Sequence, residues 1–248
     1  MLGPILDETK KMARNPRRLR EVFRLRRWRQ FFGILFFHAR TGDRWKTPAE
    51  GEKFKQREYS SYLQYLEHQQ SKFQHLDLAD YDRNYRRILA GRLQKLPALK
   101  KGASVLCLGA RQGTEVKAFL DLGCFAVGID LNPGVGNEFV MHGDFHALQF
   151  PAGSVDVVFT NSFDHAFDPK KMIGEVNRIL KPDGVFIVEA SRGESEAVAP
   201  DHYASFWWQR VDDLVALLEE QGFHVLQRSS FEQPWPGEQI CLGKRARA

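Results

Sequence analysis

The stretch VLCLGARQGTEV, residues 105–116, decides how this chain is expected to fold. A short apolar run ends, two glycines follow at Gly109 and Gly113, and an amphipathic run begins. This order predicts a buried strand, a tight turn and a helix whose first backbone N–H groups are free to bind a ligand. A second apolar run ends in Asp130, seventeen residues after Gly113. An acidic residue there can accept hydrogen bonds from ribose hydroxyls, so the two segments indicate an adenosine-type ligand, with an ordinary βα turn as the alternative.

Apolar runs continue to alternate with amphipathic runs after residue 101. The expected strands cover residues 104–108, 125–130, 139–141, 155–160, 185–189, 223–228 and 238–242. The expected helices among them cover residues 114–122, 169–180 and 206–220. Alternation of this kind predicts βαβ crossovers and a parallel sheet. A Pro/Gly turn, PWPGE, joins the last two strands, which predicts an antiparallel hairpin at the edge of the sheet.

The chain before this α/β region is predicted to be helical. Apolar side chains recur at helical spacing in residues 17–38, 52–70 and 79–96, and a linker covers residues 41–51. We therefore expect a basic amphipathic helical arm (1–45), a helical extension (46–98) and an α/β domain (99–248). Four ring-bearing side chains assigned to the second helix either cover the ligand as a lid or only pack the helix: Tyr59, Tyr62, Tyr65 and His68.

Positive charge is concentrated in the arm. The net charge is +5, but the segment from Lys10 to Arg29 holds ten basic residues and one acid, so the remainder carries −4. This distribution argues against a general nucleic-acid-binding surface. Within residues 17–38, arginines lie opposite an aromatic face that includes Trp28 and Phe32, which is typical of a helix lying on an anionic membrane. The alternatives are packing on the main domain, dimerisation, or binding of nucleic-acid phosphates.

The cysteines and the lengths of the apolar runs indicate where in the cell the protein is located. Cys107, Cys124 and Cys241 are odd in number and widely spaced, which favours reduced thiols over disulfides or a zinc site. No run reaches the roughly 20 apolar residues that a membrane-spanning helix needs. We expect a cytoplasmic protein, located at the inner face of the membrane if the arm binds lipid.

The α/β region resembles the class I SAM (S-adenosylmethionine)-dependent methyltransferases, and within them the type 11 domains. The first motif of that family is usually acidic-x-Gly-x-Gly-x-Gly; here Cys107 takes the acidic position and Arg111 the second glycine. The runs at 155–161 and 180–188 match the family's fourth strand and the turn into its fifth. The resemblance implies a Rossmann-like, seven-stranded, mostly parallel sheet with an antiparallel C-terminal hairpin, plus the helical N-terminal extension.

The resemblance also implies a cofactor site for SAM. Asp130 matches the ribose-binding acid, and Asp144 with Phe145 matches the pair that flanks the adenine. Because the acid is missing at Cys107, we expect Glu115 to organise the amino-acid half of SAM, with Arg111 on its carboxylate; a dipole-satisfying charge at the helix start is the alternative for Glu115. The predicted cofactor-binding residues are Gly109, Ala110, Arg111, Gly113, Glu115, Asp130, Leu131, Asp144, Phe145 and Asn161.

Methyl transfer from a sulfonium needs alignment and removal of a proton from the acceptor. The segment after the fourth strand offers His165 as the base, with Asp164 orienting it or acting itself. The alternative is that Asp168 caps the next helix and His165 only lines the cofactor pocket. His202 is a second candidate base, and an exposed loop residue is its alternative.

Two other groups of residues are candidates for a site. His142 and His146 flank Asp144, but histidine does not favour magnesium, so no metal is predicted. Trp207 and Trp208 are placed at the start of the helix 206–220, where they either stack on a sugar or aromatic acceptor or pack in the core. The turn residue Trp235 has the same two interpretations.

The predicted activity is transfer of a methyl group from SAM to a hydroxyl, or a nitrogen, of a small-molecule or glycan acceptor. Resemblance of the GARQGTEV and DHAFD segments to sequences of cell-envelope sugar pathways, together with the arm, suggests a lipid-linked glycan. An RNA methyltransferase and a non-catalytic SAM-fold scaffold are the competing hypotheses. The first is disfavoured because the segment after the fourth strand lacks an Asn-Pro-Pro-aromatic motif.

Overall fold

The computed structural model describes residues 45–46, 52–70 and 79–245, all within one compact unit. The predicted helix at 17–38 and most of the predicted linker lie outside the described residues. Among the residues described, no helix is long and apolar enough to cross a lipid bilayer.

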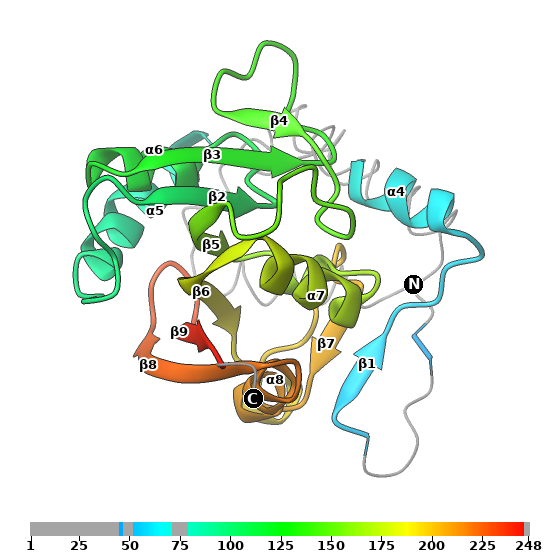
Figure 1. The fold of residues 1–248 in the computed structure, drawn as a ribbon. Helices are drawn as coiled ribbons and strands as arrows, with labels where there is room; N and C mark the ends of the chain where they lie inside the picture. Colours follow the sequence, from blue (N-terminus) through cyan, green and yellow to red (C-terminus); the bar gives the residue numbers. More distant parts are fainter. Residues whose placement is uncertain (1–44, 47–51, 71–78, 246–248) are drawn as a thin grey trace, which may run out of the picture. The chain divides into compact units, whose positions relative to one another are not determined.

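A seven-stranded sheet forms the centre of this unit, in the order β4-β3-β2-β5-β6-β9-β8 (Figure 1). All neighbouring pairs are parallel except β6 with β9 and β8 with β9. The strands are β2 (Ser104–Leu108), β3 (Phe125–Asp130), β4 (Val140–His142), β5 (Val155–Thr160), β6 (Leu180–Ser191), β8 (Phe223–Phe231) and β9 (Gly237–Lys244). The predicted mostly parallel sheet with an antiparallel C-terminal hairpin is therefore confirmed.

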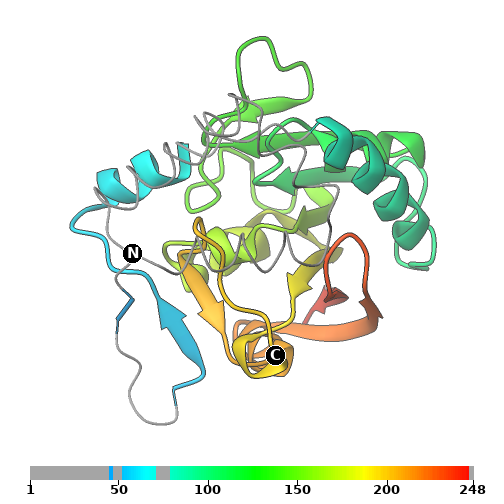
Figure 2. The same ribbon diagram turned by 180° about the vertical axis from the view of Figure 1, so that it is seen from behind.

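Helices cover both faces of the sheet, which explains the nearly continuous apolar runs in its central strands. On one face, Leu106 and Val158 pack with side chains of α7 (Pro169–Ile179) and α8 (Val211–Glu220). On the other face, Cys107 and Phe159 pack with side chains of α5 (Ala79–Leu93) and α6 (Thr114–Asp121). The helix α7 lies in front of the sheet in Figure 1, and α5 comes forward in the reverse view of Figure 2.

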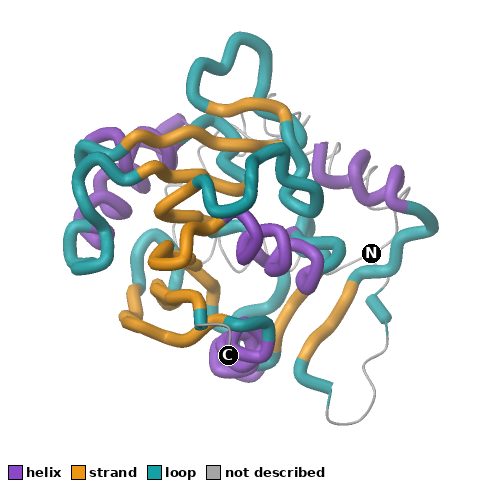
Figure 3. Tube along the Cα trace, in the orientation of Figure 1, coloured by secondary structure: helices purple, strands orange, loops and turns teal. Residues whose placement is uncertain are grey.

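The N-terminal extension is only partly helical, so the predicted helix over 52–70 is wrong in its first half. Phe54–Gln56 form strand β1, which pairs antiparallel with β7 (Phe206–Trp208) in a separate two-stranded sheet, and helix α4 begins at Tyr62 (Figure 3). Backbone pairing between segments about 150 residues apart decides this conformation, and no local periodicity signals it.

The predicted helix over 206–220 is wrong at its start for the same reason. Trp207 and Trp208 belong to β7, and α8 starts three residues later at Val211. Both indole rings are buried and stack on each other, with centroids 5.0 Å apart, and the Trp208 Nε1–H donates to the Ser191 carbonyl. They are core residues and provide no exposed stacking wall. Trp235 is half-buried and packs against Tyr85 and Phe231.

The strand order reverses between β2 and β5, and this position fixes where a ligand can bind. From β2 the chain proceeds to β3 and β4 on one side, then crosses to β5 and β6 on the other. Connections leave the carboxyl ends of β2 and β5 in opposite directions, and in open α/β sheets ligands bind in the crevice at such a switch point. The glycine loop follows β2, and the segment that carries Asp164 and His165 follows β5.

A buried carboxylate network fixes α5 to the sheet. Glu189 of β6 is buried, and both of its oxygens accept hydrogen bonds from Arg92 at 2.7 Å. The Tyr85 hydroxyl and the Gln239 side-chain amide also donate to this carboxylate, each at 2.8 Å. Four hydrogen bonds thus compensate for removing the charge from water.

We expect Arg92→Leu to destabilise the protein by about 3–5 kcal/mol, because Glu189 would stay buried without its cation. Urea unfolding followed by circular dichroism measures this loss. The matched control on the same helix is Arg86→Leu, which breaks an ion pair with Asp121 that is nearly half exposed on both sides, and it should cost about 1 kcal/mol or less. Equal losses in the two variants would contradict the role given to the network.

Candidate active site

The loop after β2 can only be built with the residues found there. Gly109 and Gly113 have φ angles of +66° and +81°, and Arg111 between them has φ +49°. A Cβ atom at Gly109 would lie 2.8 Å from the Cβ of Ser162, so the loop packs directly on the segment after β5. Gly109 therefore brings the loop backbone close to the Ser162 side chain, and a glycine-rich loop at this place is typical of a Rossmann-type ligand site.

Asp130, at the tip of β3, organises this loop. Its carboxylate accepts hydrogen bonds from the backbone N–H of Arg111 at 2.9 Å and of Asn132 at 2.8 Å. A carboxylate can accept about four hydrogen bonds, so Asp130 can accept further hydrogen bonds from the hydroxyl groups of a ligand. Leu131 follows at the start of the same connection and is half-buried.

Asp144, after β4, is held by three donors. The backbone N–H and the Nδ1 of His146 both bind Oδ1 at 2.8 Å, and the Tyr62 hydroxyl of α4 donates to Oδ2. Burial alone would raise the pKa of Asp144, but these hydrogen bonds outweigh it and lower the pKa to about 2. Asp144 is therefore ionised at neutral pH, and its carboxylate can accept further hydrogen bonds from a ligand.

His146 joins the two halves of the crevice, a role that the sequence analysis missed. Its Nε2 accepts the backbone N–H groups of Phe167 and Asp168, each at 3.1 Å, so its Nδ1 carries the proton that is donated to Asp144. The ring is buried. Neighbouring Phe145 is also buried and lies in the core cluster with Ile129. The pattern Asp-Phe-His was visible in the sequence, but the backbone partners of His146 lie 21 and 22 residues further along the chain.

Helix α4 (Tyr62–Gln70) covers the side of the crevice that Asp144 occupies. Tyr62 contacts Asp144, and the fully buried Tyr65 lies near enough to Asp144 and Asp130 for both charges to add to the effect of burial in raising its pKa. Tyr59 precedes the helix and binds the Nδ1 of the buried His68. Helix α4 thus lies where a lid over the ligand was predicted, and the lid itself stays a prediction.

Glu115 and Asn161 meet beneath the glycine loop. The Asn161 amide donates to Glu115 Oε1 at 2.8 Å and to the Tyr85 hydroxyl at 3.0 Å. Glu115 is 4% exposed, and burial raises the pKa of its carboxyl to about 7, with the Arg111 charge acting in the opposite direction. Buried Cys107 lies nearby: burial raises its thiol pKa, and the charge of Glu115 adds to this rise.

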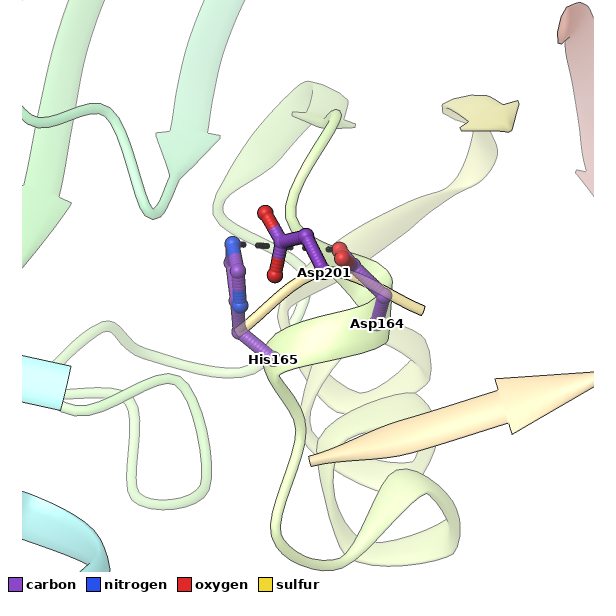
Figure 4. A group of neighbouring side chains, drawn as sticks. All are labelled: Asp164, His165 and Asp201. Carbon is purple, nitrogen blue, oxygen red and sulfur yellow. Dashed lines mark ion pairs between the residues drawn. The ribbon is translucent and has the colours of Figure 1, made fainter. Parts of the chain in front are cut away.

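Three ionisable side chains meet on the other side of the crevice: Asp164, His165 and Asp201 (Figure 4). Asp164 and His165 belong to the short helix η3 (Phe163–His165). A ring nitrogen of the histidine and one carboxylate oxygen from each aspartate all lie within 4.8 Å of one another. The Nε2 of His165 is 3.9 Å from Asp164 Oδ1. The sequence analysis missed Asp201, since only the fold brings its loop to η3.

The tautomer of His165 follows from its hydrogen bond. Its Nδ1 lies 2.9 Å from the Tyr203 carbonyl, which can only accept, so Nδ1 carries the proton and Nε2 the lone pair of the neutral ring. Asp201 Oδ1 accepts from the backbone N–H groups of Tyr203 and Ala204, which holds the loop in place. The His165 ring can therefore accept a proton at Nε2, beside the carboxylates of Asp164 and Asp201.

The alternatives for the remaining residues are also decided. Asp168 caps α7, because its side chain accepts the Lys171 N–H at 3.0 Å. His202 is partly buried and packs against the rings of His68 and Tyr203, so the exposed-residue interpretation is wrong. The pKa of His68 falls to about 3, mainly through burial, with the nearby charges of Arg57, His202 and His165 adding to it.

Comparison with known proteins agrees with this geometry. Residues 106–188 match the model of a methyltransferase domain family. A protein of Mycolicibacterium smegmatis described as a "Probable S-adenosylmethionine-dependent methyltransferase" is 27% identical over 147 residues. The alignment covers 53% of this chain and 56% of the relative, so the chain spans about half the length of the protein it matches.

Over residues 106–188 the chain is similar to methyltransferase domains. This finding confirms the family resemblance predicted from the sequence and supports SAM as the cofactor. The solved structures confirm the Rossmann-like fold of the methyltransferase domain. A SAM-dependent methyltransferase of Aquifex aeolicus is 16% identical, with a TM-score of 0.52, and the match covers 67% of this chain and 98% of that chain.

A second solved structure, 1,6-didemethyltoxoflavin-N1-methyltransferase of Burkholderia thailandensis, covers more of the chain. It is 16% identical, has a TM-score of 0.59, and the match covers 82% of this chain and 99% of that chain. It was solved with 1,6-didemethyltoxoflavin and S-adenosylhomocysteine bound.

We expect Gly109→Ala to weaken binding of S-adenosylhomocysteine to the methyltransferase domain at least tenfold, because the added Cβ displaces the loop from Ser162. Gly153→Ala is the matched control. Its φ of +63° carries the same backbone strain, but a Cβ there meets nothing within 4 Å. Calorimetric titration measures both affinities. Loss of affinity in both variants would show that general destabilisation, and not the loop contact, is responsible.

Proposed function

We propose that this chain is a methyltransferase that moves the methyl group of SAM to a hydroxyl, or a nitrogen, of a small-molecule or glycan acceptor. One observation carries the proposal: a histidine with a defined Nε2 lone pair lies beside two carboxylates, on the segment that packs against the glycine loop. The structural neighbour with a bound heterocycle acts on a small molecule, which supports the acceptor class.

The residues present fit the cofactor. The crevice between β2 and β5 has a loop that excludes a side chain at Gly109, and two acids, Asp130 and Asp144, on the side proposed for the nucleoside. When bound, SAM supplies a methyl group on a sulfonium, whose C–S electron pair remains on sulfur as the methyl leaves. Asp130 would bind the ribose of SAM, and Asp144 would bind its adenine. The glycine loop would lie against the edge of the cofactor that faces the backbone.

The protein itself has to orient the acceptor and remove its proton. His165 takes the proton from the acceptor oxygen or nitrogen on Nε2 as the new bond to the methyl carbon forms. The resulting imidazolium is stabilised by the carboxylate of Asp164, with Asp201 also in the group. The Tyr203 carbonyl keeps the ring oriented throughout, because Nδ1 is protonated both before and after the transfer.

We expect His165→Ala to lower kcat by about a hundredfold to ten-thousandfold while leaving the affinity for S-adenosylhomocysteine unchanged. The assay incubates methyl-labelled SAM with panels of sugars, glycolipids, small alcohols, amines and RNA, and then compares variants on the acceptor that is labelled. His142→Ala is the control, since His142 is exposed on β4. Full activity in His165→Ala would remove the proposed base, and labelling of RNA alone would favour the RNA methyltransferase hypothesis.

The scaffold hypothesis has its own motivation in Cys107 and Arg111, which depart from the family's first motif. Calorimetry with SAM tests it directly. Absence of binding at high cofactor concentration would favour the scaffold and reject the enzyme.

We further propose that residues 17–38 of the arm attach the protein to the cytoplasmic side of an anionic membrane. The composition of the arm supports this, since each basic residue near such a surface contributes roughly 1 kcal/mol. We expect the full chain, but not a chain lacking residues 1–40, to float with liposomes that contain phosphatidylglycerol. Neutral phosphatidylcholine liposomes are the control. Equal flotation of both chains would contradict membrane binding by the arm.

A further inference from the structure

Two buried carboxylate oxygens lack a partner at the place where α5 meets the start of α6. They are Oδ2 of Asp82 and Oε2 of Glu115, and neither has a hydrogen-bond partner among the described residues. The side chain of Asp82 is hydrogen-bonded to Thr114, so it lies at the first turn of α6. A buried acceptor without a donor is unfavourable, and native proteins keep such groups where something else supplies the donor.

The two acids belong to one electrostatic neighbourhood. Burial is the main influence on both acids and raises the pKa of each. The charge of Arg111 lowers both pKa values, and the charge of Asp82 adds to the rise at Glu115. The guanidinium of Arg111 forms no ion pair with a described side chain at 4.0 Å or less, so it does not neutralise either acid by direct contact. The group therefore consists of two under-solvated carboxylates and a cation.

The position of this group points to its ligand. Glu115 is the second residue of α6, directly after the glycine loop, and Asn161 fixes its Oε1 so that Oε2 is the unused atom. Cys107 of β2, in the position where the sequence resemblance expects an acid, is a buried thiol. An ammonium group offers three donors and a positive charge, which matches two orphan carboxylate oxygens.

We propose that Asp82 and Glu115 together bind the ammonium group of the methionine half of SAM, while Arg111 binds its carboxylate. This inference rests on the proposed cofactor and adds Asp82, which the sequence analysis did not identify. The negative charge absent from the end of β2 is then supplied from the facing helices α5 and α6. The site would select nucleosides that keep a free amino acid group over those that lack one.

A comparison of two ligands tests the inference. S-adenosylhomocysteine has the amino acid group, and 5′-methylthioadenosine shares its nucleoside and sulfur but lacks that group. We expect Asp82→Asn and Glu115→Gln each to weaken binding of S-adenosylhomocysteine by about tenfold to a hundredfold in calorimetric titrations. Binding of 5′-methylthioadenosine should change less than threefold. Asp121→Asn, on the exposed side of α6, is the control and should bind both ligands like the unmodified chain.

Folding of the variants is checked by their melting temperatures. Glu115→Gln keeps a carbonyl for the Asn161 hydrogen bond and removes a buried ionisable group, so its melting temperature at pH 8 should not fall. An equal loss of both ligands in the two variants would overturn the inference and leave the proposed function intact. Failure of the unmodified chain to bind either ligand would overturn the proposed function itself. Unchanged binding of S-adenosylhomocysteine in both variants would reject the ammonium site alone.

Discussion

The carboxylate of Asp130 is the constraint on which the site depends. It accepts the N–H groups of Arg111 and Asn132, so the connections after β2 and β3 are tied to one side chain. The Ala110 N–H also donates to the Ile129 carbonyl at 3.0 Å, which extends the pairing of the two strands into the loop. With the loop held in this way, Arg111 can keep its left-handed conformation, and the start of α6 faces the crevice.

A network of hydrogen bonds connects the region after the glycine loop to the buried core. Asn161 connects Glu115 to Tyr85, and Tyr85 connects to Glu189, which Arg92 neutralises. This chain of hydrogen bonds runs from the helix after the glycine loop through the end of β5 to α5. Buried polar groups of this kind are favourable only when every member has its partner. Within this hydrogen-bond network of described residues, the oxygen without a partner is Oε2 of Glu115, beside the loop.

The sequence was sufficient for features that depend on local pattern. The bounds of β2, β3 and β5 were predicted to the residue, because their apolar runs are bounded by turns. The cap of α7 by Asp168 was an alternative visible in the Asp-Pro pair. Features that depend on distant pairing could not be predicted in this way. The strands β1 and β7 contain helix-compatible residues, and only their mutual backbone hydrogen bonds make them strands. The roles of His146, Asp82 and Asp201 likewise arise from partners far away in the chain.

The pairing of β1 with β7 has a consequence for protein engineering. The Arg57 guanidinium donates to the carbonyls of Ala204 and His202, so a residue from the N-terminal extension supports the loop that carries Asp201. The wall of the crevice beside His165 is thus a composite of two gene segments separated by well over a hundred codons. Chimaeras that exchange only the Rossmann-like part between homologues would break this composite. Transfer of acceptor preference from one homologue to another requires that both segments be transplanted together.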